Sequence, residues 1–300
     1  MSRFNPMFFL FIATLIFPRW GNAANVAPSS SHSVTEKRVI ALTWSSAEAL
    51  LALGVTPVGV ADPQGYRDWV QWPSMPNTVI NIGTRSEPNL ELIHTLKPDL
   101  IVAGPALHDI LSATVDANVL ILDTFRADHA NSKAIDEDFL KLAHAIGKTK
   151  QAEHVLQQRA QAIQGWKQQL EQHFSGHLPK VTIVHFLSTT TAAVYGQNSS
   201  VEYALTQLGI DAAMPTSSTA WGQTPLPIQQ LTAVGSHVLI YIRPFADEKK
   251  LFSSILWQHM PFVKQNHFLA IEPSWTFGSA LSIKRLAQVT AQALLTLDTP

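Results

Sequence analysis

The sequence predicts an α/β fold in which two lobes of alternating strands and helices are connected by a single long helix. Short apolar runs that are typical of strands alternate with helical patterns over residues 38–122, and the alternation starts again at residue 181. Between these halves, residues 136–174 carry a helical pattern interrupted only by Gly147 and Gly165. A chain of 300 residues is also long enough for one core to divide into two domains.

The first lobe is expected at residues 25–147. Its strands are predicted at residues 38–42, 57–61, 100–103 and 119–122, and its helices at residues 45–53, 90–96 and 110–113. Ser45 and Glu48 have the spacing of a capping box, in which the serine accepts from the start of the helix and the glutamate reaches back.

The connecting helix is expected at residues 148–175 and the second lobe at residues 176–300. Residues 148–174 would form a helix about 40 Å long at about 1.5 Å per residue, which can hold two lobes at a nearly fixed separation. The alternative is two shorter helices joined at Gly165. In the second lobe, strands are predicted at residues 181–186, 238–242 and 268–271, and helices at residues 201–208, 228–234 and 279–297.

The two lobes also share a local pattern. Residues 90–96 align without a gap with residues 228–234, and the strands that follow, at 100–102 and 238–240, then coincide. In this register Arg85 corresponds to Gln223, and Glu91 corresponds to Gln229. The match suggests two equivalent lobes, although any two amphipathic helix–strand units share such a pattern.

Residues 1–24 have the features of a cleaved secretory signal. Arg3 precedes an apolar run at residues 7–17, and small residues follow at 21–24. A membrane helix needs about 20 apolar residues, so an uncleaved anchor is the weaker alternative. No cysteine follows the cleavage region, which excludes a lipid anchor there. We therefore expect a protein of the periplasm.

The composition excludes several chemistries. A chain without cysteine has no disulfide framework, zinc ribbon, iron–sulfur cluster or thiol nucleophile. The formal charge of −1 gives no sign of nucleic-acid binding. The motifs of serine hydrolases, phosphate-binding loops, dinucleotide sites and H-E-x-x-H metal centres are absent from the sequence. We therefore expect neither an enzyme nor a metal held by protein ligands.

Large aromatic residues and one arginine fall on loops that lead from strands into helices or on irregular segments beside them. In open α/β sheets, ligands bind at the carboxyl ends of strands, where such loops gather. The candidate ligand residues are Trp44, Trp69, Arg85, Trp221, Trp275 and Phe277. Core packing is the alternative for each tryptophan, and a surface ion pair with Glu87 is the alternative for Arg85. Trp72, Trp166 and Trp257 are assigned to packing.

Several segments spread over the chain carry a combination of residues that points to one family. They include Tyr-Arg-Asp-Trp at 66–69, Gly-Thr-Arg-Ser-Glu-Pro-Asn-Leu-Glu at 83–91, Leu-Trp-Gln-His-Met-Pro-Phe-Val at 256–263 and Trp-Thr-Phe-Gly at 275–278. Together they resemble the periplasmic iron(III)-hydroxamate siderophore-binding proteins, the ferrichrome-binding components of ABC importers. The resemblance implies the class III, helical-backbone type of periplasmic binding protein, with a shallow cleft between two lobes.

This resemblance also implies site residues. Arg85 would donate hydrogen bonds to hydroxamate oxygens of the ligand, and Trp44, Trp69, Trp221 and Trp275 would form an apolar wall. Gln223 and Phe277 match two further contact positions, but Phe277 replaces a tyrosine and lacks its hydroxyl. A tyrosine is also missing after residues 100–103, so ligand preference is expected to differ from the ferrichrome type.

A second implied surface would meet the membrane permease. Glu91 matches a carboxylate that contacts permease arginines, whereas the corresponding position of the second lobe is the neutral Gln229. The second docking acid is therefore not identified.

The expected function is capture of ferric hydroxamate siderophores by a monomer without a cofactor of its own, and their delivery to an inner-membrane ABC permease. Hydroxamate groups fill the coordination sphere of Fe(III) with oxygen, so iron needs no ligand from the protein. Another iron chelate of the catecholate or citrate-hydroxamate type, haem and vitamin B12 are alternative ligands. Catecholate complexes would favour several cations, and only Arg67 and Arg243 could join Arg85. From other classes, a periplasmic hydrolase and a sequestering protein without an importer are alternatives.

Overall fold

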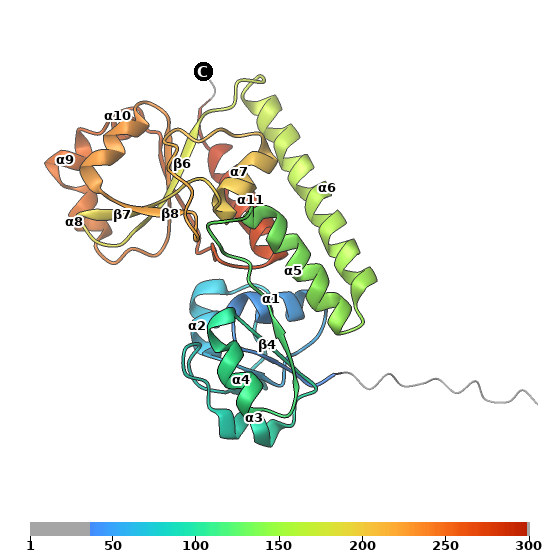
Figure 1. Ribbon diagram of the computed structural model, residues 1–300. Helices are drawn as coiled ribbons and strands as arrows, with labels where there is room; N and C mark the ends of the chain where they lie inside the picture. The colour runs from blue at the N-terminus through green and yellow to red at the C-terminus, as the bar shows by residue number, and fades with distance from the viewer. Residues whose placement is uncertain (1–36, 299–300) are drawn as a thin grey trace, which may run out of the picture. The chain divides into compact units, whose positions relative to one another are not determined.

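The computed structural model describes residues 37–298, which form two five-stranded sheets with helices packed around them (Figure 1). The predicted signal at residues 1–24 lies outside the described residues. Within residues 37–298, no helix combines the length and the apolar character needed to cross a membrane. Two α/β halves and one long helix are present, as the sequence predicts.

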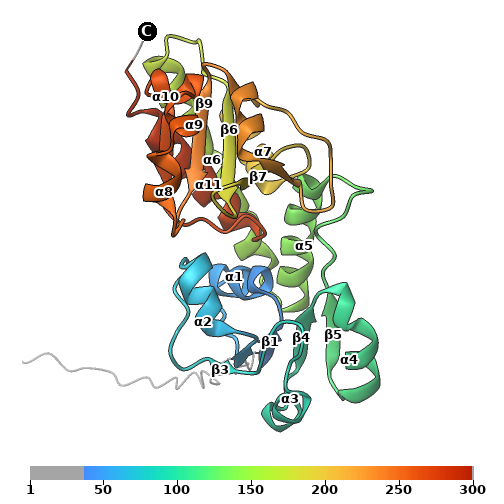
Figure 2. The same ribbon diagram turned by 90° about the vertical axis from the view of Figure 1, so that its left-hand side faces the viewer.

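The first sheet is parallel throughout and has the strand order β3-β2-β1-β4-β5. Its strands are β1 (Val39–Ala41), β2 (Gly59–Val60), β3 (Ile80–Asn81), β4 (Leu100–Ala103) and β5 (Asn118–Ile121). β1 and β4 are buried along their whole length, because helices cover both faces of a parallel sheet. Figure 2 shows β1, β4 and β5 side by side. The sequence does not predict β3, since Ile80 and Asn81 form no apolar run.

The helices of the first half are short. They are α1 (Trp44–Ala52), α2 (Pro63–Gly65), α3 (Leu90–Leu96) and α4 (His108–Thr114), with a π-helical turn at Tyr66–Val70 and a 3-10 turn at Pro105–Leu107. The predicted helix at 90–96 has the observed bounds, and the helix predicted at 110–113 is longer by two residues before it and one after. Each loop from a strand to a helix therefore comes close to where the sequence places it.

The second sheet has the order β10-β9-β6-β7-β8. Strands β6 (Val181–Phe186), β9 (Val238–Ile242) and β10 (Phe268–Ile271) run parallel and have the predicted bounds. Two further strands, β7 (Thr191–Tyr195) and β8 (Gln223–Pro227), pair antiparallel and are not predicted by the sequence. Pro225 and Pro227 in β8 hide it from a pattern-based prediction, and they are tolerated because β8 is an edge strand.

The second half contains mostly short helices and one long, buried one. They are α7 (Ser200–Leu208), α8 (Glu248–Phe252), α9 (Ile255–Gln258), α10 (Pro261–Lys264) and α11 (Ala280–Leu294). The segment Ile228–Val234 is a 3-10 helix, so the predicted α-helix at 228–234 is wrong in type. Helix α11 packs against α6 and α7.

Each sheet contains three adjacent parallel strands in the same arrangement. β1 pairs with β4 at Val39 and Leu100, and β6 pairs with β9 at Val181 and Val238. A further parallel strand, β5 or β10, follows on the outer side of each pair. The strands at 100–102 and 238–240 thus occupy equivalent places, which confirms that part of the internal alignment.

One long helix, α6 (Thr149–His173), packs beside α5 (Asn131–Ala145), α7 and α11 (Figure 1). It continues through Gly165, so the alternative of two helices joined there is wrong. Its buried Ala152 belongs to the core of the first half, whereas Ile163 and Leu170 belong to a core of the second half. Helix α6 therefore packs into the cores of both halves.

The start of α1 differs from the prediction. The helix begins at Trp44, and the side chain of Thr43 accepts a hydrogen bond from the amide of Ser46 at 3.2 Å. Glu48 does not reach back to the helix start, so the predicted capping box of Ser45 and Glu48 is wrong. Its carboxylate instead accepts hydrogen bonds at the start of α11, where buried N–H and O–H groups need an acceptor.

Candidate functional site

A cleft of about 340 Å³ lies between the two halves. Its size is in the usual range of ligand pockets, about 300–1,000 Å³. Its walls come mainly from residues at or just beyond the carboxyl ends of β1, β3, β6, β9 and β10, the edge where open α/β sheets bind ligands. All predicted ligand residues except Trp221 line it, namely Trp44, Trp69, Arg85, Gln223, Trp275 and Phe277.

The first half contributes one cation and two tryptophans. The guanidinium carbon of Arg85 lies 3.9 Å from the centre of the Trp44 ring, a cation–π arrangement. Trp44 is buried, and its indole N–H donates to the carbonyl oxygen of Asp62 at 2.9 Å. None of the ion pairs within residues 37–298 joins Arg85 to Glu87, so the surface pair considered from the sequence does not form.

The second half contributes a chain of aromatic rings. Trp275 meets Trp44 edge to face with ring centres 4.9 Å apart, and Phe277 lies 5.4 Å from Trp275. Trp221 lies 5.2 Å from Phe277, so it continues the chain although it does not line the cleft. Phe125, which the sequence analysis does not single out, stacks on Trp221 at 5.4 Å with an interplanar angle of 21°. The aromatic surface therefore extends beyond the cleft along Trp221 and Phe125.

Two half-buried polar side chains face the cleft from the second sheet. His185 lies near the end of β6, with its ring centre 6.2 Å from that of Trp69. Burial lowers the pKa of His185, so its ring is neutral at pH 7. Gln223 is the first residue of β8, a strand that the sequence does not predict. Both can exchange hydrogen bonds with a neutral part of a ligand.

A second arginine at the cleft is already engaged. Arg243 follows β9, and its Nε donates to the Tyr241 hydroxyl at 3.4 Å. Glu272 and Glu248 lie 3.6 Å and 3.9 Å from its guanidinium nitrogens. Arg85 has no ion pair within residues 37–298. The positive charge available to a ligand is therefore mainly that of Arg85.

The comparison with known proteins agrees with this arrangement. The profile of the periplasmic binding protein family matches residues 39–274. The chain belongs to this family. It is 31% identical over 273 residues to the iron(3+)-hydroxamate-binding protein FhuD of Escherichia coli, covering 87% of this chain and 88% of that protein.

Solved structures of other proteins share the fold. The siderophore-binding protein FhuD of Vibrio cholerae, crystallised with Fe3+-Desferal, has a TM-score of 0.84 and 34% identity, covering 87% of this chain and 99% of that one. FhuD2 of Staphylococcus aureus with bound ferrioxamine B has a TM-score of 0.68 at 15% identity, covering 86% of this chain and 98% of that one, which is a likeness of fold alone. The family and the fold indicated by the sequence motifs are thereby confirmed.

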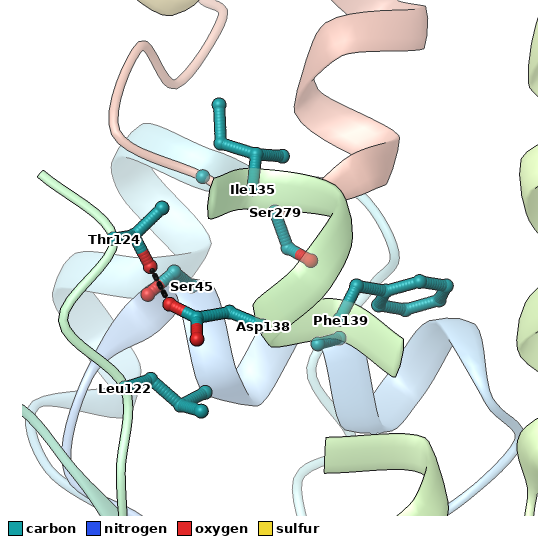
Figure 3. A pocket seen from close by; sticks show the side chains of 9 residues that line it. Ser45, Leu122, Thr124, Ile135, Asp138, Phe139 and Ser279 are labelled. Carbon is teal, nitrogen blue, oxygen red and sulfur yellow. Dashed lines mark hydrogen bonds between the residues drawn. The ribbon is translucent and has the colours of Figure 1, made fainter. Parts of the chain in front are cut away.

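A second, much smaller cavity lies beside the cleft of this periplasmic binding protein (Figure 3). Its walls come from α1, α5, the irregular segment 122–130 before α5 and the start of α11, and include Ser45, Asp138 and Ser279. The hydroxyl of Thr124 donates to Asp138 at 2.7 Å across it. With a volume of about 10 Å³, it has room for roughly one water molecule and none for an organic ligand.

The remaining tryptophans and the docking residue fall in different surroundings. Trp257 is 1% exposed in an aromatic core, and Trp166 packs on the core along α6, as predicted. Trp72 is 49% exposed, so its assignment to packing is wrong. Glu91 is exposed in the first turn of α3, while Gln229 lies in the 3-10 helix Ile228–Val234. Within residues 37–298, no three His, Asp or Glu side chains gather as metal ligands.

Proposed function

We propose that this periplasmic binding protein captures ferric hydroxamate siderophores and delivers them to an ABC permease of the inner membrane. The observation that carries the proposal is the pair of Arg85 and Trp44, which present one cation and an aromatic face to a cleft that Trp275 and Phe277 also line. Two relatives at 31% and 34% identity are named as binders of such chelates.

The chemistry of the ligand fits this cleft. Hydroxamate oxygens occupy every coordination position of Fe(III), so a binding protein needs to recognise only the organic shell and its outward oxygens. A charge-assisted hydrogen bond from Arg85 contributes about 1.5–3 kcal/mol. Micromolar affinity corresponds to about −8.2 kcal/mol, so apolar contact with the aromatic rings must supply much of the rest.

The proposal assigns roles to the predicted residues. Arg85 donates to hydroxamate oxygens, Gln223 and His185 exchange hydrogen bonds with the organic shell, and the wall is formed by Trp44, Trp69, Trp275 and Phe277, with Trp221 at its rim. Phe277 has no hydroxyl, so the ligand gains contact area there without a polar contact. This favours chelates with an apolar linker between the hydroxamate groups.

We propose that residues 1–24 direct export to the periplasm, where the monomer has lobes at 25–147 and 176–300 joined by the segment 148–175. Glu91 is proposed to meet an arginine of the permease, because it is exposed in the first turn of α3 and forms no ion pair within residues 37–298.

A fluorescence titration tests the ligand class. The purified protein is titrated with ferric ferrichrome, ferric desferrioxamine B, a ferric catecholate, haem and cobalamin, while tryptophan emission is recorded. We expect saturable quenching by the hydroxamates with Kd values at or below the micromolar range, and much weaker binding of the others. Preferential binding of haem, cobalamin or a catecholate would replace hydroxamate as the ligand class, and hydrolysis of a supplied chelate would contradict a pure binding function.

A further inference from the structure

A buried carboxylate joins the two halves of the protein directly behind the cleft. Glu48 of α1 is 0% exposed. Its two oxygens accept hydrogen bonds from the amide of Ser279 at 3.0 Å, the amide of Ser282 at 2.6 Å and the hydroxyl of Ser282 at 2.8 Å. The partners lie at the start of α11, more than 230 residues further along the chain. Glu48 therefore caps a helix of the other half.

The hydrogen bonds of Glu48 with Ser279 and Ser282 form a clamp between α1 and α11. Residues close to this clamp in the sequence form the aromatic wall of the cleft. Trp44 precedes Glu48 by one turn of α1, and Trp275 and Phe277 lie in the loop that leads into Ser279. The Trp44 and Trp275 rings touch edge to face at 4.9 Å. The clamp and the ring contact thus join the same helix to the same loop, so a shift in one must displace the other.

The fit around the carboxylate is close. A Cβ atom at position 278 would collide with Glu48 Oε2 and with Ser282, so only glycine allows the loop to pass this near. A charged group buried without water is costly, and it is tolerated when hydrogen bonds satisfy it. Here backbone amides at a helix start and one hydroxyl do so, with the helix dipole adding to the attraction.

We infer that Glu48 is a positioning residue for the ligand cleft, which holds the loop of Trp275 and Phe277 against Trp44 and so keeps these rings together as one continuous aromatic surface for a ligand. This inference rests on the proposed function of the same cleft. Glu48 does not line the cleft, so it acts on the ligand only through these aromatic residues.

The clamp also titrates in the physiological range. Burial raises the pKa of Glu48 from 4.5 to about 7, although the hydrogen bonds from Ser279 and Ser282 act in the opposite direction. Tyr66 lies near it, and burial above all, with the charge of Glu48, raises the pKa of this tyrosine. Asp138 of α5 lines the small cavity together with Ser279, and burial raises its pKa as well (Figure 3). Neither group can carry a positive charge, so neither compensates the charge of ionised Glu48.

Stability and ligand affinity should then change in opposite directions with pH. Because the pKa of Glu48 is higher in the folded protein, this group makes the fold less stable as pH rises from about 4.5 to about 7. Ionisation, however, strengthens the three hydrogen bonds of the clamp, since charge-assisted bonds are stronger than neutral ones. A purely structural role predicts the change in stability alone.

Glu48→Gln and Ser282→Ala test the inference, with Glu137→Gln as a matched control on the exposed face of α5. In Glu48→Gln, an amide N–H₂ faces the donors of α11, so we expect the Kd for ferric desferrioxamine B to rise about tenfold at pH 8. Ser282→Ala removes one bond and should give a smaller rise. In the absence of ligand, the circular dichroism signal of the Trp44–Trp275 ring pair should be weaker in both variants, because the two rings are no longer held in contact.

The pH profile supplies the second readout. In a His185→Gln background, which removes the titration of the cleft histidine, the Kd should rise as pH falls through about 7 when Glu48 is present and stay level in Glu48→Gln. Unchanged affinity in both Glu48→Gln and Ser282→Ala, together with the same pH profile with and without Glu48, would overturn the inference. Failure of the unaltered protein to bind any hydroxamate chelate would instead overturn the proposed function.

Discussion

The guanidinium carbon of Arg85 lies 3.9 Å above the ring of Trp44. The contact orients the guanidinium through its face. Its N–H groups are not used in this stacking, so they remain available as donors to a ligand. Arg85 is exposed on the loop between Gly83 and Pro88, which is closed by a backbone bridge between these two residues. The cation is thus held in place at the cleft before any ligand arrives.

Arg85→Ala should weaken the binding of ferric hydroxamates about tenfold or more, because a charge-assisted hydrogen bond worth about 1.5–3 kcal/mol is lost. The side chain is exposed, so the free energy of unfolding should change little. Fluorescence titration and urea unfolding measure the two effects. Arg38→Ala, which removes an exposed arginine bonded to the Leu96 carbonyl, is the control and should bind normally. Equal affinity of Arg85→Ala and the unaltered protein would exclude Arg85 as a ligand contact.

Trp275 and Trp257 should respond to truncation in opposite ways. Trp257 is 1% exposed and surrounded by Phe252, Phe262 and Phe268, so Trp257→Ala should cost about 3–5 kcal/mol of stability. Trp275 is half-buried at the cleft, so Trp275→Ala should chiefly raise the Kd. Urea unfolding and titration of both variants separate packing from binding. A Trp275→Ala protein with normal affinity would remove this ring from the ligand wall.

His185 should make the protein less stable in acid. Burial lowers its pKa, so the unfolded chain takes up a proton at a pH where the folded protein does not. Its contribution to stability is complete above the unfolded pKa of about 6.5 and is lost as pH falls below it. We expect His185→Gln to lose less stability than the unaltered protein between pH 7 and pH 5 in urea unfolding. Parallel pH profiles of the two proteins would contradict this assignment.

Much of the cleft can be predicted because its residues follow strands. Trp44 is the first residue of the helix that follows β1, Arg85 and Trp275 lie on loops after β3 and β10, and parallel strands bring such segments to one edge. The end of each strand is therefore enough to place them near one another, even though β3 itself is too short to predict.

Other parts depend on contacts that no local pattern contains. His185 lies within β6, and its side chain is accessible because this end of the second sheet borders the cleft. Phe125 lies on an irregular strap, and its role comes from the ring of Trp221 far along the chain. Glu48 has the spacing of a local cap, yet buried amides of α11 determine its orientation. In each case a distant part of the chain, and not the local sequence pattern, determines the role of the residue.

Variants of Glu91 should separate ligand binding from delivery to the permease. A carboxylate in the first turn of a helix is stabilised by the helix dipole by about 0.3–1 kcal/mol, so Glu91 has a local role on α3 whether or not a permease contacts it. Glu91→Gln keeps the size of the side chain and removes its charge, and Glu91→Lys reverses the charge.

Because Glu91 is exposed and does not line the cleft, both variants should bind ferric desferrioxamine B with normal Kd. If a permease arginine meets this carboxylate, uptake of the chelate by cells with the matching importer should fall in Glu91→Gln and fall further in Glu91→Lys, since like charges repel. Glu87→Lys, a charge reversal on the neighbouring exposed loop, is the control and should transport better than Glu91→Lys. Normal uptake by Glu91→Lys would leave the dipole as the sole role of this residue.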